Sequence, residues 1–313
     1  MKVWLYIGLL LGVLSSPALA IEMRLMTGDD QGTYYQIGRE IAEQTEKVGI
    51  TLKVLPSEGS WANITALVNS DAEFAIFQLD AYLKAARNYY RNTDRNLDEE
   101  IKLVMSLYHD EIHVVTAKDR PLDFLGDTSF RVGCGPVNSG SCLSADIIAS
   151  FYDKKFSYAY GSYEQALADL RRGKLDLVVI TGGKPLKLLS GQTGLDLVEL
   201  PRTEKAALVY LPTTITSADY AWLDRPVKTY GVRTVLATMI QEQEGLANDL
   251  VGTVHFTIMA NERRLKKEGH PKWKDVLFNG FNESVAHVSV LNSLRACNVI
   301  KSYGYDCTDL ARE

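Results

Sequence analysis

Three catalytic signatures are missing from this chain of 313 residues. It has no G-x-S-x-G turn for a hydrolase serine and no H-E-x-x-H helix for a catalytic zinc. It also has no Walker loop, because Pro185 follows Gly182-Gly183-Lys184 where that loop needs Ser or Thr. Histidine is scarce, with five residues and none in a recognisable triad context. We therefore predict that the protein is not an enzyme and uses no cofactor.

A strong charge excess and long apolar runs are lacking as well. The formal net charge is only −5, and no basic patch with interleaved aromatic residues is present. Nucleic acid is therefore not expected as a partner. After residue 20, no apolar run is long enough to cross a bilayer. No internal repeat, heptad pattern or low-complexity tract stands out.

The N-terminal segment has the pattern of a secretory signal peptide. Lys2 supplies the positive start, residues 3–14 are apolar, and Ala18 and Ala20 provide the small residues of a cleavage site. We expect cleavage after Ala20, so that residues 1–20 are a signal peptide and the mature protein is exported. An uncleaved membrane anchor is the alternative, although the apolar run is short for a span.

Cysteine is limited to four residues, which form two close pairs, Cys134 with Cys142 and Cys297 with Cys307. An even number of cysteines in an exported chain indicates disulfide bonds. Pairing within each local pair is the simplest of the three possible connectivities, and each bond would contribute about 2–3 kcal/mol. The alternative is a metal site that includes His109 and His113. Because those histidines lie in a predicted strand, we predict disulfides and no metal.

Strands and helices alternate along most of the chain. The first series predicts strands over 23–27, 52–55, 73–77, 102–107 and 112–117, and helices over 33–48, 61–69 and 81–92. The second series predicts strands over 130–134, 156–160, 175–180, 195–199 and 207–211, and helices over 141–152 and from a capping box at Ser162 to Arg172. A strand over 232–238 and a mostly helical segment over 241–312 complete the chain. This alternation is typical of doubly wound α/β sheets, here in two lobes around a cleft.

Short turns rich in glycine and hydroxyl side chains recur where strands end. They lie at 27–35, 57–60, 135–141 and 181–183. A strand that turns through such residues into a helix points its backbone N–H groups outward, toward an anionic or hydrogen-bonding ligand. Several turns of this kind in one chain indicate a single composite binding site.

Together these turns resemble those of the TAXI-type solute receptors of TRAP transporters. Thr27-Gly28-x-x-x-Gly32-Thr33-Tyr34-Tyr35-x-x-Gly38 matches the family's opening T-G-G-x-x-G-x-Y-Y-x-x-G motif. Ser57-Glu58-Gly59-Ser60-x-x-Asn63 matches its T-G-G-S-x-x-N turn, and the loop at 135–141 matches its G-x-x-x-S-G-T/S motif. Residues 74–80 and the Thr181-Gly182-Gly183 turn match two further segments. The matches occur in order along essentially the whole mature chain.

The resemblance implies an α/β fold of the type II periplasmic-binding-protein class. Lobe one would hold 21–116 and 228–313, and lobe two would hold 117–227. The protein would bind a small carboxylate or a glutamate-like amino acid in the periplasm and deliver it to a TRAP membrane permease. The alternative is a periplasmic ligand sensor that feeds a signalling partner.

The same resemblance assigns the ligand-binding residues. Thr27 and Gly28 would form a backbone cradle, and Tyr34 a wall or hydroxyl donor. Side-chain contacts would come from Ser60, Asn63 and Gln78, a carboxylate seat from Asn138, Ser139, Gly140 and Ser141, and an opposite rim from Thr181 and Gly182. A helix cap is an equal alternative for Ser60, and Asp80 is expected to cap the helix that follows it.

The chain departs from the family pattern in three places. Asp29 and Asp30 replace a glycine-rich stretch, and Glu58 replaces the usual glycine. Extra carboxylates beside the cleft would repel a dianion unless they pair with a ligand ammonium, so a zwitterion is as plausible as a dicarboxylate. Cys134 and Cys142 bracket the seat loop, and a bond between them would stiffen it. Arg131 and Arg233 are candidate counter-ions, with ordinary pairing or solvation as the alternative.

Overall fold

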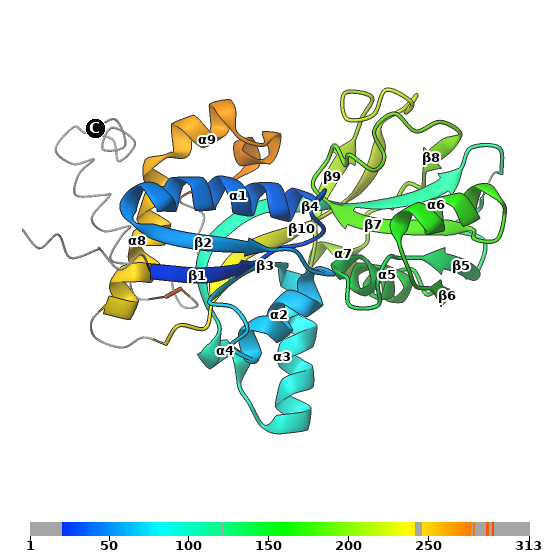
Figure 1. Cartoon of the computed structure of the whole chain (residues 1–313). Coiled ribbons are helices and arrows are strands. Elements are labelled where there is room, and N and C mark those ends of the chain that lie inside the picture. Colours follow the sequence, from blue (N-terminus) through cyan, green and yellow to red (C-terminus); the bar gives the residue numbers. More distant parts are fainter. Residues whose placement is uncertain are drawn as a thin grey trace, which may run out of the picture.

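A mixed sheet of ten strands runs through the part of the protein that the structure describes (Figure 1). The computed structural model describes residues 21–120, 122–241 and 246–276, with 278, 286, 287 and 290, and only the backbone of 246–249. The strand order is β2-β1-β3-β10-β4-β7-β5-β6, with β8 paired to β4 and β9 paired to β10. Helices pack on the sheet in both halves, so the predicted α/β fold class is confirmed. Within this part of the chain, no helix combines the length and apolarity of a membrane span.

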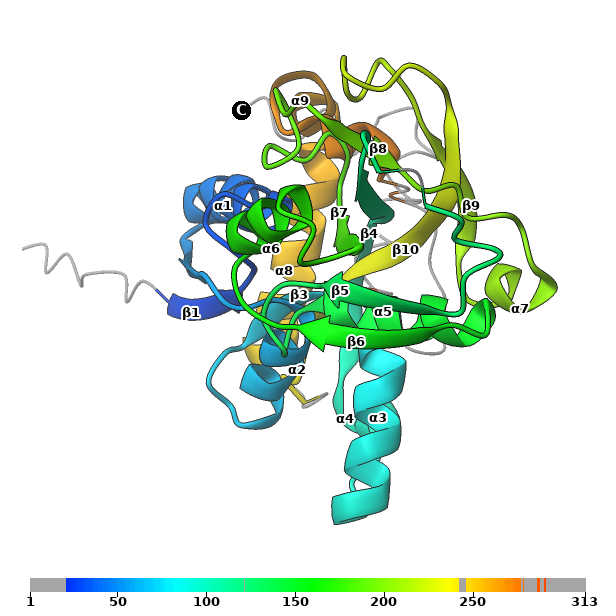
Figure 2. The ribbon, with the colours of Figure 1, turned by 90° about the vertical axis from the view of Figure 1, so that its right-hand side faces the viewer.

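Lobe one is built on parallel strands, in which β1 pairs with both β2 and β3. Its strands and helices follow the predicted alternation closely: β1 (Ile21–Met26), α1 (Thr33–Thr45), η1 (Glu46–Val48), β2 (Ile50–Leu55), α2 (Ser60–Val68), β3 (Phe74–Gln78), α3 (Leu79–Thr93) and α4 (Leu97–Glu100). Every residue of β3 is buried, as expected for a strand with both faces covered. Figure 2 shows α3 projecting beyond the rest of the molecule.

The C-terminal helices return to lobe one after the chain has built lobe two. They are α8 (Leu246–Ala260), α9 (Glu262–Glu268) and η2 (Pro271–Asp275), and α8 packs against α1 (Figure 1). Trp273 of η2 is fully buried and donates its indole N–H to Glu40 of α1. The predicted helical character of 241–312 holds for the described residues. Cys297 and Cys307, like the proposed signal peptide at 1–20, lie outside the described residues.

Lobe two continues the sheet with parallel strands, in which β5 pairs with β6 and β7. Its elements are β5 (Ser129–Gly133), α5 (Gly140–Phe151), β6 (Lys155–Ala159), α6 (Tyr163–Arg171), β7 (Leu177–Gly182), β8 (Leu195–Leu197), α7 (Glu204–Ala207) and β9 (Leu211–Ile215). The predicted strand over 207–211 is wrong. Thr203 caps α7 by accepting the Ala206 N–H (3.1 Å), so Ala207 ends a helical turn and the strand begins only at Leu211.

Two long strands belong to both lobes, β4 (Lys102–Ala117) and β10 (Val227–Thr238). We predicted two strands where β4 is one, because His109, Asp110 and Glu111 interrupt the apolar pattern. The backbone nevertheless stays extended, since β10 and then β7 supply its antiparallel partners. The cores separate along β4: Val104 and Leu107 pack in lobe one, whereas residues 112–117 pack in lobe two. We therefore propose lobe boundaries near Glu111 and Val232. Compared with the boundaries expected from the resemblance, these make lobe two a few residues longer at each end.

A buried ion pair joins the two lobes beside this passage. The Lys272 ammonium of η2 lies 2.7 Å from Glu111 Oε1, and the two side chains are 1% and 5% exposed. The same ammonium donates to the His109 carbonyl (2.9 Å) and to Asp275 (3.0 Å). The other Glu111 oxygen accepts the Lys184 backbone N–H (2.8 Å) in the turn that follows β7. One carboxylate thus connects the C-terminal segment of lobe one with a turn of lobe two.

A second buried carboxylate, Asp80, lies where α3 meets lobe two. The expectation that Asp80 caps α3 is wrong, because Gln78 is the N-cap residue and Asp80 lies in the first turn. Asp80 Oδ2 accepts hydrogen bonds from Ser144 (3.0 Å) and Tyr210 (2.8 Å), both in lobe two, and Oδ1 accepts the Ala81 N–H (2.7 Å). Burial raises the pKa of Asp80 to about 6 despite these donors.

The raised pKa of Asp80 predicts a pH dependence of stability. The folded state binds the proton more tightly than the unfolded chain, so stability is greatest below the unfolded pKa and falls as pH rises through about 6. Asp80→Asn removes this titration, so the free energy of unfolding of the variant should rise by about 2 kcal/mol relative to that of wild type as the pH goes from 4 to 7. Urea unfolding at several pH values measures the difference. A difference that stays constant over this range would contradict the prediction.

Candidate functional site

A cavity of about 530 Å³ lies where the two lobes meet, and the glycine-rich turns line it. Its lining includes most of the residues that the resemblance assigned to the ligand: Gly28, Tyr34, Ser60, Gln78, Ser139, Gly140, Ser141, Thr181 and Gly182. These residues come from the four glycine-rich turns, two in each lobe, and from Gln78 at the end of β3 in lobe one. The structure therefore brings the predicted composite site together. Whether a ligand occupies it stays a prediction.

Four helices begin at this cavity. The starts of α1 and α2 line it from lobe one, and the starts of α5 and α6 line it from lobe two. The first backbone N–H groups of a helix have no partner inside the helix, and the helix dipole gives this end a partial positive charge. The cavity wall therefore presents outward-facing amides from both lobes, an arrangement suited to a ligand carboxylate.

The turn between β2 and α2 explains why two predicted contact residues do not line the cavity. Asn63 is fully buried, and its amide donates to the Thr27 carbonyl and to the Ile76 carbonyl (2.6 Å). Its oxygen accepts the Ser57 hydroxyl (2.5 Å). Thr27 is also fully buried and donates its hydroxyl to the Leu55 carbonyl (2.8 Å). Asn63 and Thr27 hold the first two turns against each other, and their polar groups face the protein.

Ser60 lines the cavity, and its alternative role as a helix cap is wrong. Gly59 is the N-cap residue of α2, with a φ of +119° that a side chain would strain. Ser60 is the first helical residue, and its hydroxyl accepts the Gln78 backbone N–H (3.1 Å). This bond ties the start of α2 to the end of β3, so the two contribute adjacent parts of the cavity wall.

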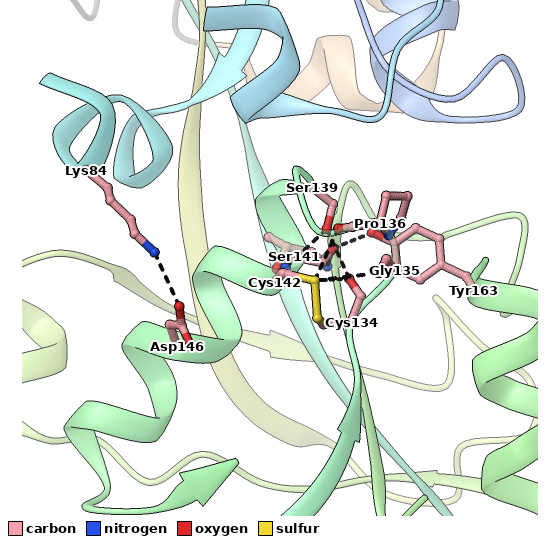
Figure 3. The surroundings of a disulfide bond; sticks show 10 residues. Lys84, Cys134, Gly135, Pro136, Ser139, Ser141, Cys142, Asp146 and Tyr163 are labelled. Atoms are coloured by element: carbon pink, nitrogen blue, oxygen red, sulfur yellow. Dashed lines mark hydrogen bonds and ion pairs between the residues drawn. A yellow bond between two sulfur atoms is a disulfide. The ribbon is translucent and has the colours of Figure 1, made fainter. Parts of the chain in front are cut away.

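The seat loop of lobe two is held by a disulfide bond and a helix cap (Figure 3). Cys134 and Cys142 are bonded, as predicted from their local pairing. Ser139 accepts the Cys142 N–H (3.2 Å) as the N-cap of α5 and donates its hydroxyl to the Cys134 carbonyl (3.0 Å). Ser141 accepts the Tyr163 hydroxyl (2.8 Å) and the Thr181 N–H (2.9 Å). These bonds leave the Gly140 and Ser141 backbone N–H groups at the open end of the helix.

Asn138 lies outside the cavity lining, at its edge. Its amide donates to Glu58 (3.2 Å) in lobe one, so it contacts the opposite lobe and not the cavity interior. Lys187 makes a similar contact on another part of the rim, donating to Gln31 (2.5 Å). Lys84 of α3 and Asp146 of α5 form a third contact between lobes (3.3 Å; Figure 3). These exposed polar pairs hold the lobes in a closed arrangement.

Sequence reasoning missed the most buried acid of the site, Asp110 of β4. Asp110 is fully buried and lines the cavity. Its Oδ2 accepts hydrogen bonds from Tyr34 (2.7 Å), Thr234 (3.1 Å) and the Gln78 amide (3.4 Å). Burial raises the pKa of Asp110, while the Tyr34 hydroxyl and the Lys272 charge act against that rise. The polar residues His109, Asp110 and Glu111 between two predicted apolar strands were the available signal, because buried acids are rare without a specific role.

The charges that line the cavity are mostly negative. Asp29, Glu58, Asp110 and Glu164 line it together with Lys187. None of the described lining residues is an arginine. The candidate counter-ions lie elsewhere: Arg131 pairs with Asp176 (2.6 Å), and Arg233 donates to Ser106 (2.9 Å). A ligand carboxylate would therefore rely on helix N-termini, while the acids favour a positive group on the same ligand.

The two histidines considered as metal ligands, His109 and His113, do not form a metal site with each other in this structure. His113 is fully buried, its Nε2 lies 2.9 Å from the Tyr220 hydroxyl, and burial lowers the pKa of its ring to about 4. His109 precedes Asp110 on β4 and does not line the cavity. Among the described residues, no three or more His, Cys, Asp or Glu side chains are grouped so that they could hold a metal ion.

Gly140 allows the two lobes to meet. A Cβ at this position would lie 2.1 Å from Gln78 Oε1 and 2.9 Å from Ser60 Oγ, both in the opposite lobe. Gly140→Ala should hinder closure and weaken ligand binding by about tenfold, with little change in the free energy of unfolding, since the start of a helix accepts alanine. Titration calorimetry measures the affinity, with the exposed Ser150→Ala on the same helix as control. Wild-type affinity in Gly140→Ala would contradict the closed arrangement of the lobes.

The disulfide provides a separate prediction for the seat loop. Replacing both Cys134 and Cys142 by alanine should lower the free energy of unfolding by about 2–3 kcal/mol, because the unfolded chain regains the freedom of the short loop. Ligand affinity should fall as well, since binding must then order residues 135–141. Urea unfolding and calorimetry on the same samples test both effects. Unchanged stability would show that the bond does not constrain the loop.

Comparison with known proteins agrees with this architecture. The fold is similar to that of XAC2383 from Xanthomonas citri bound to ATP (TM-score 0.50, 8% identity, 90% of this chain and 98% of that chain). It is equally similar to a protein from Bordetella bronchiseptica RB50 (TM-score 0.50, 14% identity, 88% and 89%). A TctC solute binding protein from Polaromonas gives a TM-score of 0.47 at 16% identity (90% and 96%). In this chain the mixed α/β sheet is shared by two lobes. A family model described as the NMT1-like family matches residues 25–277, and the chain therefore belongs to that family.

Proposed function

We propose that the protein is a solute-binding receptor that holds a small carboxylate or amino acid between its lobes and delivers it to a membrane permease. The observation that carries this proposal is the convergence of four helix N-termini, two from each lobe, on one cavity. Its volume of about 530 Å³ falls in the usual range for small-molecule sites. Membership of the NMT1-like family and the two-lobed fold support the same function.

Ligand capture would be coupled to closure of the lobes. The polar contacts across the rim, such as Lys187 with Gln31 and Asn138 with Glu58, are exposed and individually weak. A ligand held by amides from both lobes contacts its full set of partners only in the closed form. It therefore shifts the population toward that form by its difference in affinity for the two forms. The closed surface is what a permease would recognise.

The residues that line the cavity suit reversible ligand binding better than catalysis of a reaction on the ligand. Among the described residues that line the cavity there is no histidine and no cysteine. The hydroxyls of Ser139 and Ser141 are engaged in the cap and in the bonds to Tyr163 and Thr181. No serine of the described lining therefore has a histidine base beside it, as nucleophilic catalysis would require. We infer that the protein acts as a receptor and not as an enzyme.

The permease class and the compartment rest on the sequence. The turns at 27–38, 57–63 and 135–141 resemble those of TAXI-type receptors, which supports a TRAP permease as the partner. The signal-peptide pattern of residues 1–20 supports export to the periplasm, with cleavage after Ala20.

Ligand-dependent stabilisation tests the receptor function directly. The mature protein should gain thermal stability with at least one compound from a panel of carboxylates and amino acids, by about 2.7 kcal/mol at a concentration one hundred times Kd. Differential scanning fluorimetry gives the shift, and mass spectrometry of denatured protein identifies any ligand that copurifies. Absence of both a stabilising compound and a copurifying ligand would reject the proposal. Sodium-driven uptake by the reconstituted TRAP permease, with and without the receptor, tests the partner separately.

A further inference from the structure

Three oxygen atoms in the wall of the cavity are buried and have no hydrogen-bond partner among the described residues. They are Asp110 Oδ1, Gln78 Oε1 and Thr181 Oγ1. All three residues line the same cavity, and the Asp110 and Gln78 side chains are almost completely buried. Buried polar atoms are nearly always satisfied, so three unsatisfied oxygens in one cavity point to an absent donor.

The surrounding hydrogen bonds establish that Asp110 Oδ1 and Gln78 Oε1 are acceptors, and the Thr181 hydroxyl oxygen can also accept. Tyr34, Thr234 and the Gln78 amide nitrogen all donate to Asp110 Oδ2, which leaves Oδ1 as the available carboxylate oxygen. The bond to Asp110 also sets the orientation of the Gln78 amide, because the reverse orientation would place its oxygen against the carboxylate. Gln78 Oε1 is therefore the free atom of that side chain.

The sheet brings the three residues to one place. Gln78 ends β3, Asp110 lies on β4, and Thr181 lies near the end of β7. Ile112 is directly opposite Thr181 in the antiparallel pair of β4 and β7. Asp110 is two residues from Ile112, so its side chain leaves the same face of the sheet as that of Thr181.

In the described part of the protein, no cation forms a hydrogen bond or an ion pair with Asp110. Its hydrogen-bond donors are two hydroxyls and one amide, all neutral. The Lys272 ammonium acts on Asp110 electrostatically but is bonded to Glu111, Asp275 and the His109 carbonyl. Lys187 is engaged with Gln31. A buried carboxylate without a charged partner is unfavourable, so a cationic donor at Oδ1 would stabilise the site.

We propose that Asp110 Oδ1, Gln78 Oε1 and Thr181 Oγ1 form the subsite for a protonated amine. An ammonium group has three N–H donors and no acceptor, which matches three acceptors without partners. The ligand carboxylate would then face the helix N-termini, and the ligand would be an amino acid. This assignment rests on the proposed receptor function and adds that Asp110 selects amino acids over carboxylates that lack the amine.

Matched ligands separate the amine contribution from the rest of the binding energy. The standard L-amino acids are titrated alongside their desamino acids and decarboxylated amines, for example L-glutamate, glutarate and 4-aminobutyrate. Wild-type protein should bind its preferred amino acid about 100-fold more tightly than the desamino acid. Asp110→Asn should reduce this preference to about tenfold or less while changing the affinity for the desamino acid only a few-fold.

Two further variants keep the experiment interpretable. Asp71→Asn changes an exposed acid on the turn after α2 and should retain the full preference. Thr181→Val removes one acceptor at nearly constant volume and should lower the preference by a few-fold. If Asp110→Asn does not fold, as circular dichroism would show, Thr181→Val and the wild-type selectivity still decide the question.

The outcomes distinguish the subsite from the receptor function. If a desamino acid binds wild type as tightly as its amino acid, or if Asp110→Asn weakens both equally, the amine subsite is wrong and the receptor function stands. If no compound binds and no small molecule copurifies, the receptor function fails and the subsite fails with it. Loss of the amine preference in Asp110→Asn alone supports the assignment.

Discussion

Strand β4 runs through both lobes, and the polar residues at its middle govern how the two lobes meet. This one strand is shared by both lobes, so its polar residues must be satisfied in the buried space between them. Neighbouring strand residues point to opposite faces, and Asp110 and Glu111 accordingly serve different surroundings. Glu111 meets the Lys272 ammonium and the Lys184 backbone N–H, whereas Asp110 lines the cavity.

The Glu111–Lys272 pair illustrates how a costly interaction can be retained. A buried ion pair often contributes little net stability, because both ions lose their hydration. Here the Lys272 ammonium also donates to the His109 carbonyl and to the Asp275 carboxylate, and the Glu111 carboxylate also accepts the Lys184 N–H. Most of the hydrogen-bonding capacity of the two ions is therefore used. The pair connects η2 with β4 and with the turn after β7. It therefore links the C-terminal segment to the glycine turn at the rim of the cavity.

The cavity combines two kinds of electrostatics that favour opposite charges. Helix N-termini from both lobes present amides, which favour a carboxylate, while the side-chain charges of the lining are mainly acidic. The disulfide, the Ser139 cap and the bonds of Ser141 hold the amides of lobe two in position before any ligand arrives. A rigid wall of this kind lowers the ordering cost of binding, so that ligand binding can be coupled mainly to lobe closure.

Much of the fold was predictable because local pattern and tertiary environment agree. The alternation of apolar strands with amphipathic helices located β1, α1, β3 and α6 to within a few residues, and Ser162 caps α6 as its motif indicated. Prediction failed where long-range partners decide the conformation. The residues around Ala207 form a capped helical turn, and the polar stretch at His109–Glu111 continues a strand because β7 and β10 supply its hydrogen bonds.

In the candidate site, too, locally determined features were predictable from the sequence and features that depend on long-range partners were not. The turns that carry glycine and hydroxyl residues could be located from the sequence, because their chemistry is local. Proximity along the chain also made the Cys134–Cys142 bond the simplest of three possible pairings, and the structure contains it. The three-dimensional arrangement was needed to see that Asn63 and Thr27 face the protein, that Ser60 bonds to Gln78, and that Asp110 lines the cavity. These roles depend on groups contributed by distant segments. A side chain's partners across a sheet or between lobes follow from the three-dimensional fold and leave no trace in the spacing of residues along the chain.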